Sequence, residues 1–174
     1  MNICAFARVQ VSFAELLVAA TDRGVCFLTW CDGDELGHLG AHCAKTGLVL
    51  AAPGGKLARH HLEAATEQLI AYGEGEREDF DLELDLFGTE FQSAAWTVLR
   101  GIPFGMTITY GEQAKRLGNP GAFRAVGAAN GSNPLPIIVP CHRVVASGGL
   151  GGFSGGAERK AGLLALEGYR QLLD

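Results

Sequence analysis

The sequence lacks the features of membrane-spanning, secreted and disulfide-framework proteins. Its longest stretch without a charged side chain, residues 125–142, is interrupted by Asn130, Asn133 and Pro134 and could not cross a bilayer as a helix. Arg8 and Glu15 interrupt any signal-peptide core in the first twenty residues. Five cysteines form an odd set without framework spacing, which favours reduced thiols over disulfides. We therefore expect a globular, cytoplasmic protein with no membrane partner.

A net positive charge is also missing, because the chain carries 14 basic and 19 acidic residues for a formal charge of −5. The two halves differ, however. Residues 1–85 hold 6 Lys and Arg against 14 Asp and Glu, whereas residues 86–174 hold 8 against 5. An acidic domain joined to a mildly basic one fits this distribution, although chance variation in composition fits it too. The basic balance of the second half makes a polyanionic partner permissible despite the negative net charge. We place the domain boundary between residues 85 and 86.

What is present is an apolar share of 48%, enough for a sizeable core, and 25 glycines, which indicate many tight turns. Short runs rich in Val, Phe and Leu predict strands at residues 3–11, 14–20 and 24–30. Apolar spacing predicts helices at 34–43 and 56–72, the second burying Leu57, His61, Leu62, Ala65, Leu69 and Tyr72. An acidic linker at 73–79 and an alternating edge or connecting strand around Leu84 follow. The first domain is thus expected to be α/β.

Helix signals dominate the second half. Thr89 can cap a helix at 91–100, with Phe91, Ala94, Ala95, Val98 and Leu99 as its core stripe. Thr109 and Glu112 can form a capping box for a helix at 110–117, and a glycine-containing turn leads to another at 122–130. This pair matches a helix-turn-helix, in which the second helix enters a DNA groove. A packed helical hairpin would look the same, and small residues in the second helix favour close backbone approach over base reading.

The segment Pro140-Cys141-His142-Arg143 carries the most informative chemistry. A cysteine nucleophile reacts as the thiolate, which forms where cationic or hydrogen-bonding groups lower its pKa. In an extended chain His142 and Cys141 would point to opposite sides, so a bridging water is the natural proton link, and Glu167 in a helix at 163–168 could orient the imidazole. A buried structural cysteine beside a satisfied histidine is the alternative that these residues leave open.

Residues 148–156 contain six glycines in nine positions. No Walker-type Lys-Ser or Lys-Thr follows, so a phosphate cradle is poorly supported. The composition predicts a loop whose backbone approaches a ligand closely, or moves to admit one. A surface loop with no role would have the same composition.

Several separate motifs in the same order resemble the signature of the O(6)-alkylguanine-DNA alkyltransferases, the methylated-DNA–protein-cysteine methyltransferases. Besides residues 140–143 they comprise Phe91-Gln92, Trp96, Pro103-Phe104-Gly105, Thr109-Tyr110-Gly111, Arg124-Ala125-Val126-Gly127, residues 130–134 and residues 163–168. The likeness covers residues 80–168, and the first half matches only in general layout. It implies a ribonuclease-H-like α/β domain followed by a mostly helical domain with the helix-turn-helix and the active site.

The resemblance also implies a reaction. Cys141 would accept the alkyl group from O6 of guanine in one irreversible displacement, so that each molecule acts once. His142, a water and Glu167 would generate the thiolate, and Tyr110 would assist the departing guanine. A non-catalytic alkyltransferase-like DNA-damage binder is the alternative, although such proteins replace the nucleophile that Cys141 provides here. A transcriptional regulator and a turnover cysteine hydrolase are further rivals.

The remaining implied roles concern DNA and the base. Arg124 would fill the stack vacated by a flipped nucleotide, with Tyr110, Ala122, Ala125 and Asn130 also at the DNA. Asn133, Val139 and Ser154 would support or line the base pocket. Double-stranded DNA is the expected partner, the protein is expected to be a monomer, and no cofactor is expected. His38 and His42 have helical i,i+4 spacing that could hold zinc, but no matched ligand set accompanies them, so we predict no metal.

Overall fold

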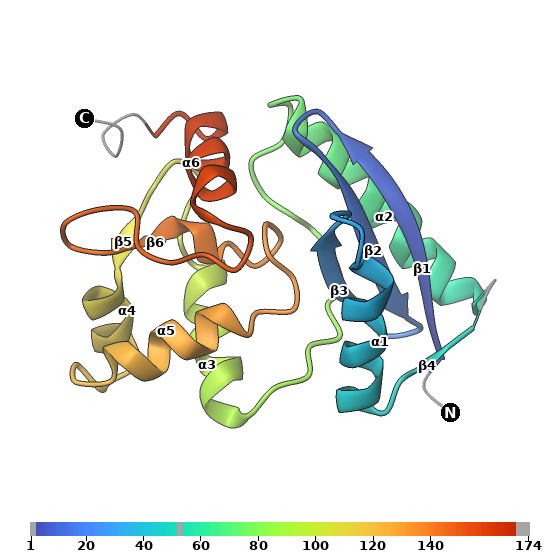
Figure 1. Ribbon diagram of the computed structural model, residues 1–174, viewed down its shortest axis with the longest axis horizontal. Coiled ribbons are helices and arrows are strands. Elements are labelled where there is room, and N and C mark those ends of the chain that lie inside the picture. Colours follow the sequence, from blue (N-terminus) through green and yellow to red (C-terminus); the bar gives the residue numbers. More distant parts are fainter. Residues whose placement is uncertain (1–2, 52–53, 170–174) are drawn as a thin grey trace. The chain divides into compact units, whose positions relative to one another are not determined.

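The computed structural model describes residues 3–51 and 54–169. The chain divides into two compact units, Met1–Phe87 and Gly88–Asp174. The first is an α/β unit built on a four-stranded sheet, and the second is mostly helical (Figure 1). No helix among the described residues is long and apolar enough to cross a membrane.

The sheet of the first unit has the order β3-β2-β1-β4. Strands β1 (Ile3–Val11), β2 (Ala14–Thr21) and β3 (Gly24–Trp30) form an antiparallel meander, and the short β4 (Val49–Leu50) pairs parallel to β1. Helix α2 (Lys56–Gly73) covers one face and α1 (Glu35–Thr46) the other, where a buried cluster includes Cys4, Cys26 and Leu39. The three predicted long strands and both helices are present.

Two details of this unit differ from the sequence prediction. Leu57 is 55% exposed, because the buried stripe of α2 begins one residue later, at Ala58. The alternating segment around Leu84 forms only an isolated bridge to Val25, not a strand. At that bridge the backbone of β3 comes so close that a Cβ on Gly24, whose φ is +151°, would lie 2.4 Å from the carbonyl oxygen of Glu83.

The second unit contains α3 (Glu90–Arg100), α4 (Tyr110–Arg116), α5 (Phe123–Gly131) and α6 (Ala157–Leu166). A small parallel pair, β5 (Ile108–Thr109) with β6 (Val144–Val145), holds the start of α4 beside the chain that follows Cys141. Thr89 caps α3 in a full capping box with Gln92, and the Thr109 hydroxyl accepts a hydrogen bond from the backbone N–H of Glu112. These caps end the preceding loops and so place Tyr110 at the first turn of α4.

Helices α3 and α5 pack together through a residue that the predicted stripe omitted. Trp96 is buried and its indole N–H donates to the carbonyl oxygen of Ala129 at 2.9 Å, whereas Ala94, predicted as core, faces solvent. Between α4 and α5 the side-chain amides of Gln113 and Asn130 exchange two hydrogen bonds, of 3.0 and 2.8 Å. Both residues are buried, so this amide pair fixes the two helices side by side.

Candidate active site

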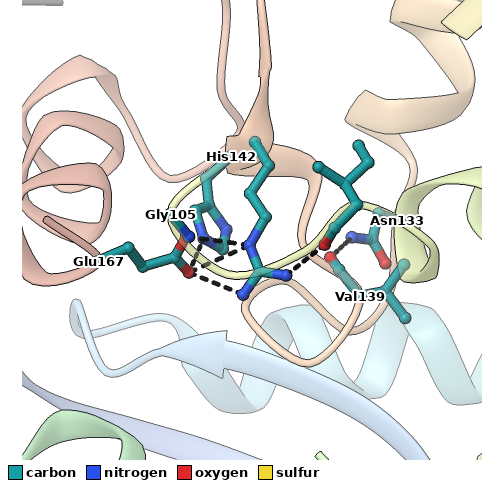
Figure 2. A network of polar contacts seen from close by, with 7 residues as sticks. Gly105, Asn133, Val139, His142 and Glu167 are labelled. Atoms are coloured by element: carbon teal, nitrogen blue, oxygen red, sulfur yellow. Dashed lines mark hydrogen bonds and ion pairs between the residues drawn. The ribbon is translucent and has the colours of Figure 1, made fainter. Parts of the chain in front are cut away.

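The cysteine of the Pro-Cys-His-Arg segment lies in a one-turn 3₁₀ helix, η1 (Cys141–Arg143), preceded by an irregular turn. The expected extended chain is therefore wrong here. Asn133 braces this turn, because its amide donates to the carbonyl oxygen of Val139 at 2.7 Å (Figure 2). The Asn133 side-chain oxygen also accepts from the backbone N–H of Leu135 at 3.0 Å. Ile137, inside the turn, has a φ of +76°, a conformation that β-branched residues rarely adopt. The surrounding bonds hold this strained backbone in place.

Cys141 lines a pocket of about 350 Å³, within the range of roughly 300–1,000 Å³ usual for small-ligand sites. The other lining residues come from α4, α5 and the glycine-rich loop: Tyr110, Gly127, Asn130, Gly131, Gly152, Phe153 and Ser154. Glycines on the α5 side leave the wall as bare backbone. Val139, expected at the pocket, is not among these residues, since it is fully buried and its carbonyl oxygen is bonded to Asn133.

The sulfur is held as a thiol at neutral pH in this structure. Burial raises the pKa of Cys141 to about 11, although a hydrogen bond from Asn133 and the positive charge of Lys160 act in the opposite direction. Desolvation dominates because Cys141 is only 5% exposed. A reaction at this sulfur would therefore need a base to remove the thiol proton.

His142 and Glu167 form a buried pair, with His142 Nε2 and Glu167 Oε1 2.8 Å apart (Figure 2). Burial raises the pKa of Glu167, but hydrogen bonds and charge from His142 and Arg143 outweigh it and lower that pKa to about 2. Burial, together with the charges of Arg143 and Lys160, lowers the pKa of His142, although Glu167 acts in the opposite direction. An ionised carboxylate only accepts, so the proton of the neutral imidazole sits on Nε2. Nδ1 is left as an acceptor, buried and without a hydrogen-bond partner among the described protein atoms.

Arg143 is the third member of this cluster, and the sequence interpretation gave it no role at the site. Its Nη2 and Nε donate to the Glu167 carboxylate at 2.9 and 3.0 Å, and its Nη1 donates to the carbonyl oxygen of Ile102 at 2.6 Å. Arg143 is 4% exposed, so it is not free to neutralise a polyanion, as the charge count of the second half had suggested. Glu167 itself lies just beyond the end of α6, not inside a helix, and also accepts from the backbone N–H of Gly105.

Lys160 is a second residue that the sequence interpretation missed. Its buried Nζ donates to the carbonyl oxygens of Val144 at 2.6 Å and Gly152 at 3.0 Å, and burial lowers its pKa to about 8 although Cys141 raises it. The Tyr110 hydroxyl donates to the same Gly152 oxygen at 3.1 Å. A signal was available in the sequence. Lys160 has the helical spacing of the apolar residues Leu163 and Leu164 and of Glu167, and a lysine on the same helical face as two leucines is unusual.

The structure separates the five residues expected at DNA into two groups. Arg124 and Ala125 are exposed on the first turns of α5, Ala122 is half-buried just before it, and Tyr110 is half-buried at the pocket. Asn130 is different: both ends of its amide are bonded to Gln113, so its side chain joins α4 to α5 and is not directed at DNA. Its position still contributes to the pocket wall.

The histidines proposed as possible zinc ligands are engaged separately. His38 Nε2 lies 3.9 Å from Asp34 Oδ2, and the His42 ring stacks 4.8 Å from that of Phe27. Within residues 3–51 and 54–169 no group of three or more His, Cys, Asp and Glu side chains is arranged to hold a metal.

Comparison with known proteins gives consistent matches over both units. Residues 9–86 match the family profile described as 6-O-methylguanine DNA methyltransferase, ribonuclease-like domain, and residues 90–169 match the DNA binding domain of the same family. The methylated-DNA–protein-cysteine methyltransferase of Mycolicibacterium paratuberculosis is 60% identical over 104 residues, 59% of this chain and 63% of that protein. The methylated-DNA–protein-cysteine methyltransferase of Methanosarcina acetivorans is 55% identical over 105 residues, which is 60% of this chain and 67% of that protein. The chain thus spans about two thirds or less of these relatives' lengths.

Solved structures resemble the fold over nearly the whole chain. The crystal structure of Mycobacterium tuberculosis O6-methylguanine methyltransferase has 38% identity and a TM-score of 0.77, covering 94% of this chain and 92% of that one. The structure of Mycobacterium tuberculosis OGT in complex with DNA has the same identity and a TM-score of 0.76, with coverage of 95% and 92%.

Proposed function

This chain belongs to the 6-O-methylguanine DNA methyltransferase family, and from that membership and its site we propose that it repairs DNA by moving an alkyl group from O6 of guanine to Cys141. The observation that carries the proposal is a cysteine at the wall of a pocket, beside a His142–Glu167 pair whose free imidazole nitrogen is unprotonated. Double-stranded DNA containing O6-alkylguanine is the proposed substrate. The protein acts as a monomer in the cytoplasm.

We propose the following reaction at this site. The Cys141 proton passes through a water to His142 Nδ1, and Glu167 stabilises the imidazolium that forms. The sulfur attacks the alkyl carbon, so the S–C bond forms as the O6–C bond breaks and its electron pair returns to the guanine. Tyr110 then donates a hydrogen bond or its proton to the guanine, after leaving the Gly152 oxygen that it bonds in this structure. Because water does not cleave the S–C bond of the resulting thioether at neutral pH, Cys141 is consumed.

The positive charge of Lys160 favours the thiolate at the moment when the thiol proton leaves. Ser154 belongs to the pocket wall that receives the base, while Asn133 and Val139 support the turn that carries Cys141. A base inside a duplex cannot reach this pocket, so it is everted at a cost of about a few kcal/mol, least for damaged bases.

The finer fold assignments form part of the same proposal. The order β3-β2-β1-β4, with only β4 parallel to its neighbour, supports a ribonuclease-H-like topology for the first unit. Helices α4 and α5 with their tight turn support a helix-turn-helix, in which α5 lies against DNA. The residues with proposed chemical and DNA-binding roles all fall within residues 86–174, and we propose that this stretch carries both activities.

One experiment tests the proposal directly. The protein is incubated with a duplex that contains O6-methylguanine, and the intact protein and its peptides are weighed by mass spectrometry. We expect a gain of one methyl group, on Cys141, limited to one equivalent per protein molecule. Repeated turnover would instead indicate a hydrolase, and DNA binding without transfer would indicate the non-catalytic damage binder.

Arg124→Ala is expected to slow methyl transfer from duplex DNA by about tenfold or more. Flipping the base out of the duplex costs about a few kcal/mol, and in this variant no side chain fills the vacated position to offset that cost. Attack on the free base O6-methylguanine should fall much less. Lys115→Ala removes an exposed cation at the end of α4 and serves as the matched control, since it should weaken only phosphate attraction. Equal losses on duplex and free base would remove the stacking role of Arg124.

A further inference from the structure

Helix α5 presents a large aromatic ring to solvent at its first turn. Phe123 is 51% exposed, whereas the residues that α5 buries are Val126, Ala129 and Asn130. Single exposed apolar residues are common in folded proteins and need no explanation by themselves. The position of Phe123, however, does need an explanation.

Phe123 lies near the Cys141 pocket without lining it. Helical spacing of four residues places it on the same side of α5 as Gly127 and Gly131, which line that pocket as bare backbone. Phe123 lines a neighbouring hollow of about 350 Å³ that shares Tyr110 with the first. The remaining residues of this second hollow are Thr109, Gly111, Ala146 and Ser147.

The ring is also paired with Arg124. The guanidinium carbon of Arg124 lies 5.9 Å from the centroid of the Phe123 ring, a cation–π distance. The two side chains therefore offer adjacent planar surfaces on one exposed helical turn. Planar apolar and guanidinium groups are the ones that stack on nucleobases.

We propose that Phe123 is a DNA-contacting wedge, whose ring packs against the base pair next to the everted guanine while Arg124 occupies the vacated position. This inference rests on the proposed function and adds a second stacking residue to it. Minor-groove proteins insert single Phe, Leu or Ile side chains between base steps and so lower the cost of distorting the duplex. Lys115, exposed in the last turn of α4, supplies a positive charge for the phosphates near this site.

The surroundings of Phe123 fit a base step better than a protein partner. Its neighbours Ala122 and Ala125 are small, so the ring projects singly and is not part of a broad patch. Specific protein interfaces need about 800 Å² from each partner, far more than one ring supplies. A single base–aromatic contact, in contrast, is enough to change affinity.

The test compares Phe123→Ala with wild type on two substrates. Single-turnover transfer from O6-methylguanine duplex is expected to fall by about tenfold, the effect of losing one base–aromatic contact, whereas reaction with the free base falls much less. Phe123→Trp should restore duplex transfer, because it keeps a stacking surface. Met106→Ala, which removes another exposed apolar side chain of the same unit (57% exposed), is the matched control and should match wild type on both substrates.

A second measurement reports insertion itself. 2-Aminopurine placed next to the lesion becomes brighter when its stack is opened, and this rise on binding should be smaller with Phe123→Ala than with Met106→Ala. Equal losses on duplex and free base, or wild-type behaviour of Phe123→Ala in both measurements, would overturn the inference. If wild type binds the duplex but transfers no methyl group, the proposed function fails, and the fluorescence comparison still decides whether Phe123 enters the stack.

Discussion

Cys141→Ser is expected to abolish methyl transfer, by at least about a thousandfold, while binding to O6-methylguanine duplex persists. A serine hydroxyl is a far weaker nucleophile than a thiolate, and the His142–Glu167 pair does not compensate for the difference in acidity. The residues of α5 that are proposed to contact DNA are untouched by the change. Single-turnover assays with labelled duplex would measure transfer, and fluorescence anisotropy would measure binding.

Cys31→Ser provides the matched control, because Cys31 is a half-buried cysteine of the first unit with no place at the pocket. It should retain one equivalent of transfer. A methyl group found on any residue of Cys141→Ser protein would show that another side chain is the acceptor. Loss of DNA binding together with transfer would show instead that Cys141 supports the folded pocket.

Glu167→Gln is expected to lower the free energy of unfolding by about 3–5 kcal/mol and to suppress transfer strongly. The loss of stability arises because the Arg143 guanidinium, 4% exposed, would be left without its counter-charge. The loss of transfer arises because a neutral amide neither fixes the proton on His142 Nε2 nor stabilises an imidazolium. Chemical denaturation would measure the first effect and single-turnover kinetics the second. Glu158→Gln, an exposed position on α6, is the control and should change neither.

The pH dependence of the free energy of unfolding also tests whether Glu167 is held ionised in the folded protein. The pKa of Glu167 is depressed from 4.5 to about 2 on folding, so its contribution is fully present above pH 4.5 and is lost as the pH falls toward 2. Wild type should therefore lose stability over this interval more steeply than Glu167→Gln. Indistinguishable profiles would contradict a carboxylate held ionised by Arg143 and His142.

A double variant separates stability from chemistry. Replacing Arg143 by Met together with Glu167→Gln removes both buried charges, which often costs little stability. We expect the double variant to recover much of the unfolding free energy and none of the transfer. Recovery of transfer along with stability would mean that Glu167 acts only by holding the fold together.

Much of the secondary structure could be predicted from local patterns. The long strands of the first unit, helix α2 and the caps at Thr89 and Thr109 all depend on residues that are close in sequence. The short strands β4, β5 and β6 escaped prediction because two residues carry no periodicity, and their pairing partners lie far away along the chain. The 3₁₀ turn at Cys141 escaped for a related reason: Asn133 imposes it on a β-branched run that favours an extended chain.

The residues of the proposed site could be named from the sequence, since the order of its motifs points to Cys141 as the nucleophile, with His142 and Glu167 as its proposed imidazole and carboxylate partners. Tertiary structure alone decided their states. Whether Cys141 rests as thiol, which imidazole nitrogen is free, and whether Arg143 and Asn130 face DNA or the interior depend on burial and on partners distant in sequence. Desolvation and hydrogen bonding act through space, so a linear pattern names the groups but does not assign their charges or directions.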